Sequence, residues 1–261
     1  MLADRRDDPI DGVVVINLDR RPGRWEQFKA TWRDHLDWSR VHRLPAIDGR
    51  ALAGALAPPW FRGRRRDATW AGRAGCALSH AAAWRMAEGR GWTRTLVLED
   101  DAVPSDNPFA ALRRADPSWD LLYLGCGLPR WPGDRRQDGV TPIEGALDLH
   151  AYVVNASARD RLVGGAPTSE TIWPWIARER AVDRWIDRKA GIGLAVGCLW
   201  PPHVSQRADA SDITQRGKGD AAPSAALDSR ASRPLWRRRL EAASLDIGDR
   251  ARAAAKRLVG F

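Results

Sequence analysis

The chain has 261 residues, of which 44% are hydrophobic and 29% charged, values typical of a globular protein and not of a disordered one. The longest apolar stretch, 192–200, is far shorter than the roughly 20 residues of a membrane-spanning helix, and the charged N-terminus lacks the apolar region of a secretion signal. The three cysteines, Cys76, Cys126 and Cys198, are widely spaced and match no metal-binding pattern. We therefore expect a protein of the reducing cytoplasm.

The formal net charge of +9 is concentrated near the C-terminus. Residues 230–261 hold nine arginines and lysines against three acids, a net +6, which leaves +3 for the rest. The rest of the chain is therefore nearly neutral, and it shows no RNP, helix-turn-helix or zinc pattern, which argues against nucleic-acid binding. Residues 234–261 predict a basic amphipathic helix, interrupted near Gly248, that either contacts an anionic membrane surface or packs on the protein.

Strands and helices alternate along the chain. A β-branched run over 12–18 predicts a strand buried on both faces, and apolar residues at helical spacing predict a helix over 22–38. We expect further strands over 41–47, 95–98, 119–124, 149–154 and 192–199, and further helices over 74–89, 107–115, 156–164 and 174–190. This order predicts an α/β three-layer domain with a mostly parallel central sheet.

Three stretches lack periodicity. Residues 54–73 suit a mobile loop over a site, 127–146 a loop or hairpin insertion, and 205–233 a polar linker. The predicted organisation is a leader over 1–11, a catalytic domain over 12–214, a linker over 215–233 and a helical tail over 234–261.

The triplet Glu99-Asp100-Asp101 directly follows the predicted strand over 95–98. Three adjacent carboxylates repel one another, and a divalent cation with a preference for oxygen ligands, Mn²⁺ or Mg²⁺, would relieve that repulsion. Such a cation could bridge the two phosphates of a nucleotide sugar. The alternative is a solvated acidic turn.

Several short motifs precede and follow this triplet along the chain. They are 14–24 (VVINLDRRPGR), 44–50 (LPAIDGR), 74–80 (AGCALSH), 96–101 (LVLEDD), 119–125 (WDLLYLG), 150–154 (HAYVV), 181–183 (AVD) and 201–206 (PPHVSQ). Together they resemble glycosyltransferase family 25, which contains lipopolysaccharide-core and collagen galactosyltransferases, over residues 12–214. The resemblance implies a GT-A-like, Rossmann-like fold and inverting transfer of a hexose, usually galactose, from a UDP-sugar. The acceptor would be a saccharide or glycolipid of lipopolysaccharide or another cell-surface glycan, and the cofactor Mn²⁺ or Mg²⁺.

The resemblance also implies roles for individual residues. Donor and nucleotide binding falls to Asn17, Arg20, Arg24, Asp48, Ser79, His80, Asp100 and His150. Glu99 and Asp101 are the expected metal ligands, with Asp101 the firmer of the two. His203 either completes the metal shell or lies in a plain loop, and His80 either contacts the donor or is a structural histidine.

An inverting transfer needs a base that accepts the proton of the attacking hydroxyl. A carboxylate opposite the metal is the expected group, with Asp183 the first choice and Asp148 the second. The alternative for Asp183 is a surface acid paired with Arg180 or Arg184.

The sequence leaves two other functions open. One is a catalytically inactive sugar-nucleotide-binding or assembly protein of the same fold, and the other, a poor third, is a basic nucleic-acid-binding protein. For the leading reading, we expect a cytoplasmic protein at the inner face of the cytoplasmic membrane.

Overall fold

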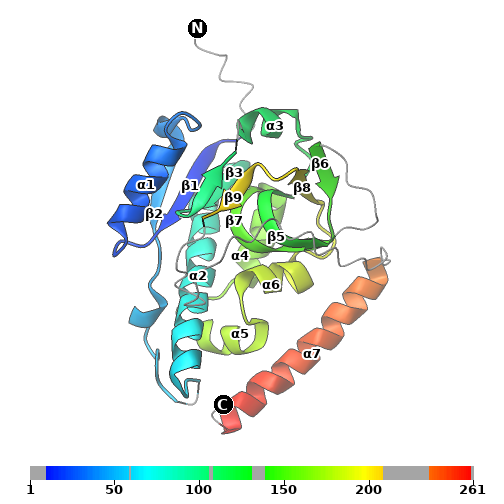
Figure 1. The fold of residues 1–261 in the computed structure, drawn as a ribbon. Coiled ribbons are helices and arrows are strands. Elements are labelled where there is room, and N and C mark those ends of the chain that lie inside the picture. The colour runs from blue at the N-terminus through cyan, green and yellow to red at the C-terminus, as the bar shows by residue number, and fades with distance from the viewer. Residues whose placement is uncertain (1–9, 59, 106–107, 131–138, 208–234, 260–261) are drawn as a thin grey trace.

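The computed structural model describes residues 10–58, 60–105, 108–130, 139–207 and 235–259. In these residues a central sheet is covered by helices on both faces, and a two-stranded sheet lies beside it (Figure 1). The strands are β1 (Gly12–Asn17), β2 (Val41–Pro45), β3 (Arg94–Glu99), β4 (Ala102–Pro104), β5 (Leu121–Arg130), β6 (Gly139–Pro142), β7 (Gly145–Asn155), β8 (Val196–Trp200) and β9 (Val204–Gln206). The α-helices are α1 (Pro22–Trp32), α2 (Arg64–Gly89), α3 (Pro108–Arg114), α4 (Ala156–Gly165), α5 (Ile172–Glu179), α6 (Val182–Trp185) and α7 (Leu235–Val259).

The central sheet has seven strands in the order β2-β1-β3-β7-β5-β8-β6. Strands β2, β1, β3, β5 and β8 run in one direction, whereas β7 and β6 run in the other. The predicted α/β architecture with a mostly parallel sheet is therefore confirmed. The assignment to the GT-A type stays a prediction.

Strand β1 shows why the sheet is buried on both faces. Val13 and Val15 pack in one apolar cluster with Phe28 and Trp32, whereas Val14 packs in the other, which contains much of α2. Successive side chains of a strand point to opposite faces, so a continuous β-branched run fits a strand between two helical layers.

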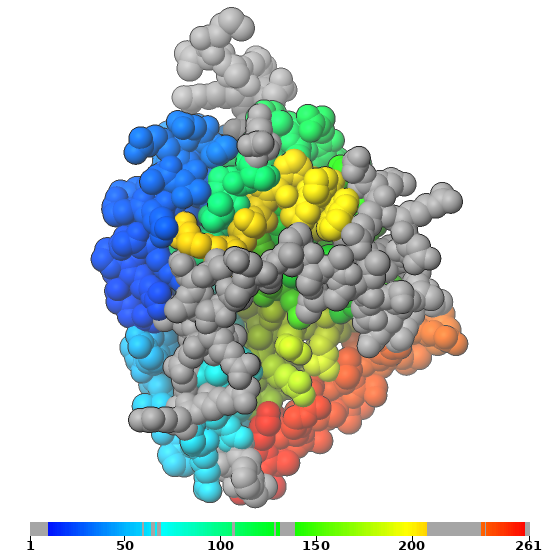
Figure 2. Space-filling model, in the orientation of Figure 1, coloured from blue at the N-terminus to red at the C-terminus, as the bar shows by residue number. Residues whose placement is uncertain are grey.

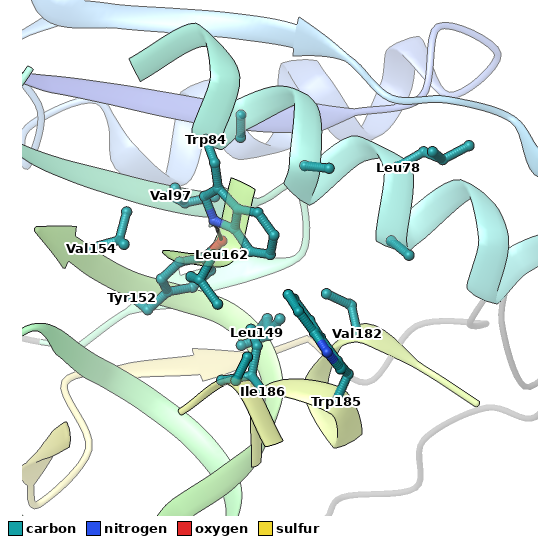
Figure 3. Close-up of a cluster of buried hydrophobic side chains, with 14 of the residues drawn as sticks. Leu78, Trp84, Val97, Leu149, Tyr152, Val154, Leu162, Val182, Trp185 and Ile186 are labelled. Carbon is teal, nitrogen blue, oxygen red and sulfur yellow. Dashed lines mark hydrogen bonds between the residues drawn. The ribbon is translucent and has the colours of Figure 1, made fainter. Parts of the chain in front are cut away.

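The cluster on the α2 face is rich in aromatic residues. Trp84 of α2, Tyr152 of β7 and Trp185 of α6 come together there with Leu162 of α4 (Figure 3). The indole Nε1 of Trp84 donates a hydrogen bond of 2.9 Å to the Tyr152 hydroxyl, so this polar tip is satisfied within the core. This packing fixes α2 against the middle of the sheet.

The first two predicted helices have different bounds in the structure. Helix α1 ends at Trp32, six residues before the predicted end. Helix α2 begins at Arg64, so the expectation of a mobile loop over 54–73 is wrong for its second half. Phe61 and Trp70 are buried in this region, and Phe61 meets Trp173 edge to face at 4.6 Å, which ties the start of α2 to α5.

The single helix predicted over 174–190 is three pieces. Helices α5 and α6 are separated at Arg180, whose φ of 74° is incompatible with a continuing right-handed helix. Residues Ile186–Ala190 then form a π-helical turn. The next strand, β8, begins at Val196, four residues later than predicted.

The stretch predicted as a loop or hairpin insertion contains an antiparallel pairing of the hairpin kind, because Gly127 and Arg130 of β5 pair with Leu147 and Gly145 of β7. Strand β6 in that stretch, and strand β9 at the start of the predicted linker, were not predicted. Strand β5 continues to Arg130 and β6 pairs antiparallel with β8, while residues 131–138 lie outside the described residues. Strand β9, at the expected linker's start, pairs antiparallel with β4. The predicted linker over 215–233 and nearly all of the predicted leader also lie outside the described residues.

Helix α7 runs without a break from Leu235 to Val259, so the interruption expected near Gly248 is wrong. A glycine inside a helix costs only about 1 kcal/mol relative to alanine, which neighbouring contacts can offset. In Figures 1 and 2, α7 lies along the edge of the molecule, where it packs beside α5 and the π-helical turn over Ile186–Ala190.

Candidate functional site

Most of the predicted site residues gather at one edge of the central sheet. Asn17 ends β1 and Glu99 ends β3 at this edge. Strand β7 runs the other way, and its pairing of Ala151 with Leu98 brings His150 and Asp148 to the same edge. Ligands of open α/β sheets bind beyond the carboxyl ends of the strands, so this edge is the candidate site.

Asp100 is buried and held by two predicted site residues. Its Oδ2 accepts a hydrogen bond of 2.7 Å from Asn17 Nδ2, and its Oδ1 accepts one of 3.0 Å from Arg24 Nη1. Burial raises the pKa of Asp100, and the Asn17 and Arg24 contacts partly offset this rise. Asp100 therefore fixes the turn after β3 by tying it to β1 and α1.

Asp101 has a different environment. Its Oδ2 accepts a hydrogen bond of 3.0 Å from Gln206 Nε2 of β9, whereas its buried Oδ1 has no hydrogen-bond partner among the described residues. Burial, followed by the negative charges of Glu99 and Asp100, raises the pKa of Asp101 to about 7. A proton or a cation at this carboxylate would offset the cost of burying the charge.

Glu99 lies at one end of a chain of hydrogen bonds that leads into the core. Its Oε1 lies 3.1 Å from His80 Nε2, and His80 Nδ1 lies 2.9 Å from the Tyr152 hydroxyl, which accepts from Trp84. Because the indole only donates, the chain is satisfied when Tyr152 donates to Nδ1 and Nε2–H donates to Glu99. Both ring nitrogens of His80 thus contact protein groups, which supports a positioning role toward Glu99 more directly than the predicted donor contact.

Ser79 and Asp48 join the start of the site to α2. The Ser79 hydroxyl donates to Gly75 O at 2.7 Å and accepts from Ile47 N at 2.8 Å, so it clamps the segment after β2 onto the helix. Gly75 leaves room for this approach, since a Cβ there would collide with Ile47 O. These contacts give Ser79 a structural role, and its predicted role in donor binding stays a prediction.

Asp48 is surrounded by arginines. It caps the short 3-10 helix over Gly49–Ala51 through the Arg50 amide, and its carboxylate contacts the Arg50 and Arg20 guanidinium groups. The Arg50 hydrogen bonds, followed by that of Arg20, hold the pKa of Asp48 well below its usual range. Arg20 and Arg24, both expected at a diphosphate, therefore each contact a carboxylate of the site.

The two candidate bases lie together. Asp183 Oδ2 accepts a hydrogen bond of 3.4 Å from the backbone amide of Asp148, and its Oδ1 accepts one of 2.7 Å from the amide of Arg184. Asp148 has a φ of 61°, a left-handed conformation uncommon outside glycine, and Gly127 leaves space for its carboxylate. Such a backbone outlier at a sheet edge is typical of a functional position.

The half-buried thiol of Cys76 lies within the electrostatic influence of these carboxylates. Burial raises the pKa of Cys76, and the negative charges of Glu99, Asp183, Asp101 and Asp148 raise it further. Carboxylates of β3, of the turn after it, of β7 and of α6 therefore lie near enough to Cys76 on α2 to raise its pKa. The sequence analysis missed Cys76, although its spacing of four residues from His80 predicts that both lie on one face of the helix.

The other two histidines among the predicted site residues, His150 and His203, lie near β9. His150 Nε2 is 3.3 Å from Val204 O. The backbone amide of His203 donates to Leu124 O at 2.8 Å, and its carbonyl accepts from the Ser105 amide at 2.8 Å, so this loop is anchored to β5 and to the end of β4. The roles of His150 in donor binding and of His203 as a metal ligand stay predictions.

Comparison with known proteins finds the same family resemblance. The family model described as glycosyltransferase family 25 (LPS biosynthesis protein) matches residues 10–120. The resemblance to family 25 is confirmed. The matched residues contain β1, α2 and β3, and with them the predicted family 25 residues from Asn17 to Asp101. Asp148, His150, Asp183 and His203 lie beyond the match.

Individual relatives carry the names of glycosyltransferases. A protein of Acanthamoeba polyphaga mimivirus whose name describes it as a glycosyltransferase is 27% identical over 186 residues, which cover 67% of this chain and 52% of that protein. Procollagen galactosyltransferase 2 of Mus musculus is 30% identical over 133 residues, covering 44% of this chain and 20% of that protein. The chain thus spans about half or less of the length of these relatives. Among solved structures it is similar to A197 from STIV, with a TM-score of 0.43, 12% identity, and coverage of 78% of this chain and 91% of that one.

Proposed function

We propose that the chain is an inverting glycosyltransferase that transfers a hexose, with galactose the first choice, from a UDP-sugar to a hydroxyl of a saccharide or glycolipid. The acceptor would belong to lipopolysaccharide or another cell-surface glycan. The family 25 match and the galactosyltransferase relative support the reaction class. The observation that carries the proposal is the buried Asp101 carboxylate at the carboxyl edge of the sheet, whose Oδ1 has no hydrogen-bond partner among the described residues.

The donor set at this edge fits a hard divalent cation, Mn²⁺ or Mg²⁺. Asp101 offers a buried carboxylate oxygen without a hydrogen-bond partner among the described residues, and Glu99 offers a second carboxylate. These two residues would hold the cation, which when bound stabilises negative charge on the departing diphosphate. His203 is a further candidate ligand from the segment before β9.

The chain's own residues bind and orient the reactants. Arg20 and Arg24 flank the start of α1, where helix N-termini favour anions, and their guanidinium groups suit diphosphate oxygens. Arg24 also contacts Asp100 and lies 3.9 Å from Asp101, so it balances part of the negative charge of the triplet. His80 Nε2, which lies 3.1 Å from Glu99 Oε1, orients the Glu99 carboxylate.

Asp183 is the proposed base. It accepts the proton of the acceptor hydroxyl while that oxygen forms a bond to the anomeric carbon and the bond from this carbon to the diphosphate breaks, releasing UDP. The amides of Asp148 and Arg184 orient the Asp183 carboxylate. Asp148, held beside it in a left-handed conformation, is the second candidate.

Release of UDP from a panel of UDP-sugars tests the proposal. We expect slow hydrolysis of one donor, UDP-galactose first, in the presence of Mn²⁺ and none in EDTA, with faster release once a saccharide acceptor is added. UDP binding without release from any donor, with or without acceptors, would favour an inactive sugar-nucleotide-binding protein. Absence of both binding and release would contradict the proposal.

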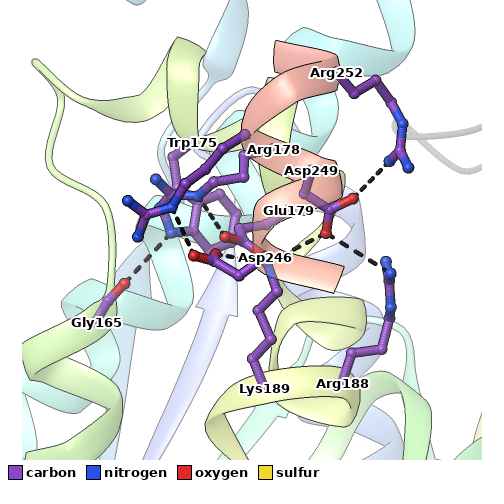
Figure 4. A network of polar contacts seen from close by, with 10 residues as sticks. Gly165, Trp175, Arg178, Glu179, Arg188, Lys189, Asp246, Asp249 and Arg252 are labelled. Atoms are coloured by element: carbon purple, nitrogen blue, oxygen red, sulfur yellow. Dashed lines mark hydrogen bonds and ion pairs between the residues drawn. The ribbon is translucent and has the colours of Figure 1, made fainter. Parts of the chain in front are cut away.

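We further propose that helix α7 contacts a membrane surface. None of the described helices is long and apolar enough to cross a bilayer. The face of α7 toward the body is polar: Asp249 is fully buried, and Lys189 of the π-helical turn contacts Asp246 at 3.1 Å, Asp249 at 3.2 Å and Glu179 at 2.8 Å (Figure 4).

The opposite face of α7 is apolar and exposed. Trp236, Leu240, Ile247 and Leu258 are 58%, 62%, 70% and 88% exposed, and their spacing of four, seven and eleven residues puts them on one face of the helix. Arginines stand on both sides of this stripe, and the helix as a whole is basic. An apolar stripe between cationic side chains is complementary to an anionic lipid surface. The proposed occupant of this face is therefore the anionic leaflet that presents a lipid-linked acceptor.

Sedimentation with lipid vesicles tests this contact. We expect the full chain to bind vesicles that contain phosphatidylglycerol more tightly than vesicles of phosphatidylcholine alone, with affinity falling as salt rises. The double change Leu240→Gln and Ile247→Gln should weaken binding about tenfold or more, because two apolar side chains no longer enter the lipid. Leu56→Gln is the matched control, since Leu56 is a leucine with nearly the same exposure, 63%, elsewhere on the surface. Equal binding by the double variant and wild type would refute the contact.

A further inference from the structure

Cys76, His80 and Glu99 form a cluster with mixed sulfur, nitrogen and oxygen donors. One ligand atom from each lies within 4.8 Å of the other two. Cys76 and His80 are one turn apart on α2, and Glu99 ends the adjacent strand β3. His80 is fully buried, and Cys76 and Glu99 are half-buried, so the cluster has a rigid base and an open side.

The geometry of this cluster fits a tetrahedral metal. Bonds of about 2.0–2.3 Å at tetrahedral angles put neighbouring ligand atoms about 3.3–3.7 Å apart. His80 Nε2 and Glu99 Oε1 are already 3.1 Å apart, so a small widening would admit an ion between them. Three protein ligands leave a fourth position for water.

The residues around Cys76, His80 and Glu99 also favour a metal site. Tyr152, itself held by Trp84, contacts Nδ1 of His80 and fixes the ring, as partners of metal-bound histidines do. The carboxylates of Asp101, Asp148 and Asp183 add negative potential around the thiol, which favours a dication. Binding would release the Cys76 thiol proton and use the His80 tautomer that carries its proton on Nδ1.

We propose that Cys76, His80 and Glu99 form a metal site selective for Zn²⁺ and similar thiolate-binding dications, distinct from the site for a hard cation at Asp101. A thiolate and an imidazole favour zinc over manganese or magnesium, whereas the carboxylates beside them do the reverse. The two sites share Glu99. Binding of Zn²⁺ therefore withdraws Glu99 from the hard-cation site, and this consequence, unlike the site itself, rests on the proposed function.

Titration of the metal-free full chain with Co²⁺, a spectroscopic substitute for Zn²⁺, tests the site. We expect one Co²⁺ per chain, a near-ultraviolet absorption band from thiolate-to-cobalt charge transfer, and loss of that band when Zn²⁺ is added. The variant Cys76→Ser should lose the band. His80→Gln should weaken binding by more than about 100-fold, because loss of a group that only supports a ligand already costs about 10- to 100-fold and His80 is itself a proposed ligand.

Two control variants separate this site from other sources of signal. Cys126→Ser should keep the band, although Cys126 and Cys198 have their sulfur atoms 3.6 Å apart and form the alternative thiol site. Asp101→Asn should also keep it, which separates failure of the hard-cation site from failure of this one. No band in the wild type, or a band that is lost in Cys126→Ser and kept in Cys76→Ser, would overturn the proposal. Circular dichroism of each variant shows that a lost band does not reflect unfolding.

Discussion

Asp101→Asn is expected to reduce Mn²⁺-dependent UDP release by at least about a thousandfold. Removal of one preorganised charge-stabilising group typically costs 10²- to 10³-fold in turnover, and here the loss includes the cation itself. The side chain keeps its size, and Gln206 still has an amide oxygen to contact. Asp160→Asn is the matched control, because it removes the charge of an exposed aspartate on α4 that contacts Arg159. Activity within tenfold of wild type in Asp101→Asn would refute the assigned role.

Asp101→Asn, which is expected to lower activity, is also expected to keep stability that the metal-free wild type loses as the pH rises. Because the pKa of Asp101 is raised to about 7 in the fold, the folded protein binds a proton that the unfolded chain releases near its ordinary value of 3.8. The stability from this proton is fully present below pH 3.8 and is lost as the pH rises through about 7. We expect the Tm of the metal-free wild type to fall between pH 5 and 8 by at least about 3 °C more than that of Asp101→Asn. Mn²⁺ at pH 8 should raise the Tm of wild type and leave that of the variant unchanged.

Asp183→Asn is expected to reduce acceptor-dependent transfer by about 10²- to 10⁴-fold while UDP binding stays within a few-fold of wild type. General-base assistance contributes rate enhancement of this size, and Asp183 has no proposed contact with UDP. The corresponding change Asp148→Asn should have a smaller effect, because Asp148 contacts Asp183 through its backbone amide, which the substitution keeps. A larger loss in Asp148→Asn would exchange the two roles. Wild-type transfer rates in both variants would exclude either as the base.

Local sequence patterns predicted the parts of the fold that depend on local rules. The β-branched run of β1 and the apolar strand before Glu99 placed the acidic triplet at the carboxyl edge of the sheet, where the structure has it. The boundaries that failed depend on tertiary contacts. The start of α2 is fixed by Phe61 and Trp70 packing near Trp173, and no periodicity in an arginine-rich stretch indicates this.

The candidate site, like the fold, was predicted only in part. The resemblance to a family predicted Glu99, Asp101 and Asp183, and the need for a base added Asp148. The structure places all four near enough to Cys76 to raise its pKa. It did not predict the partners that hold them. Tyr152 and Gln206 reach the site only because β7 runs antiparallel to β3 and because β9 returns to pair with β4. Both pairings join residues about 50 to 100 positions apart, and neither strand's local pattern specifies its neighbour.

Calorimetry of UDP binding with Mn²⁺ and with EDTA tests whether Asp101 binds a divalent cation that holds the nucleotide, and it requires neither the right sugar nor the right acceptor. We expect wild type to bind UDP in Mn²⁺ with one site per chain and EDTA to weaken this binding at least about tenfold. Asp101→Asn should bind UDP equally weakly under both conditions. UDP binding of equal strength with and without metal, or no UDP binding at all, would contradict this expectation.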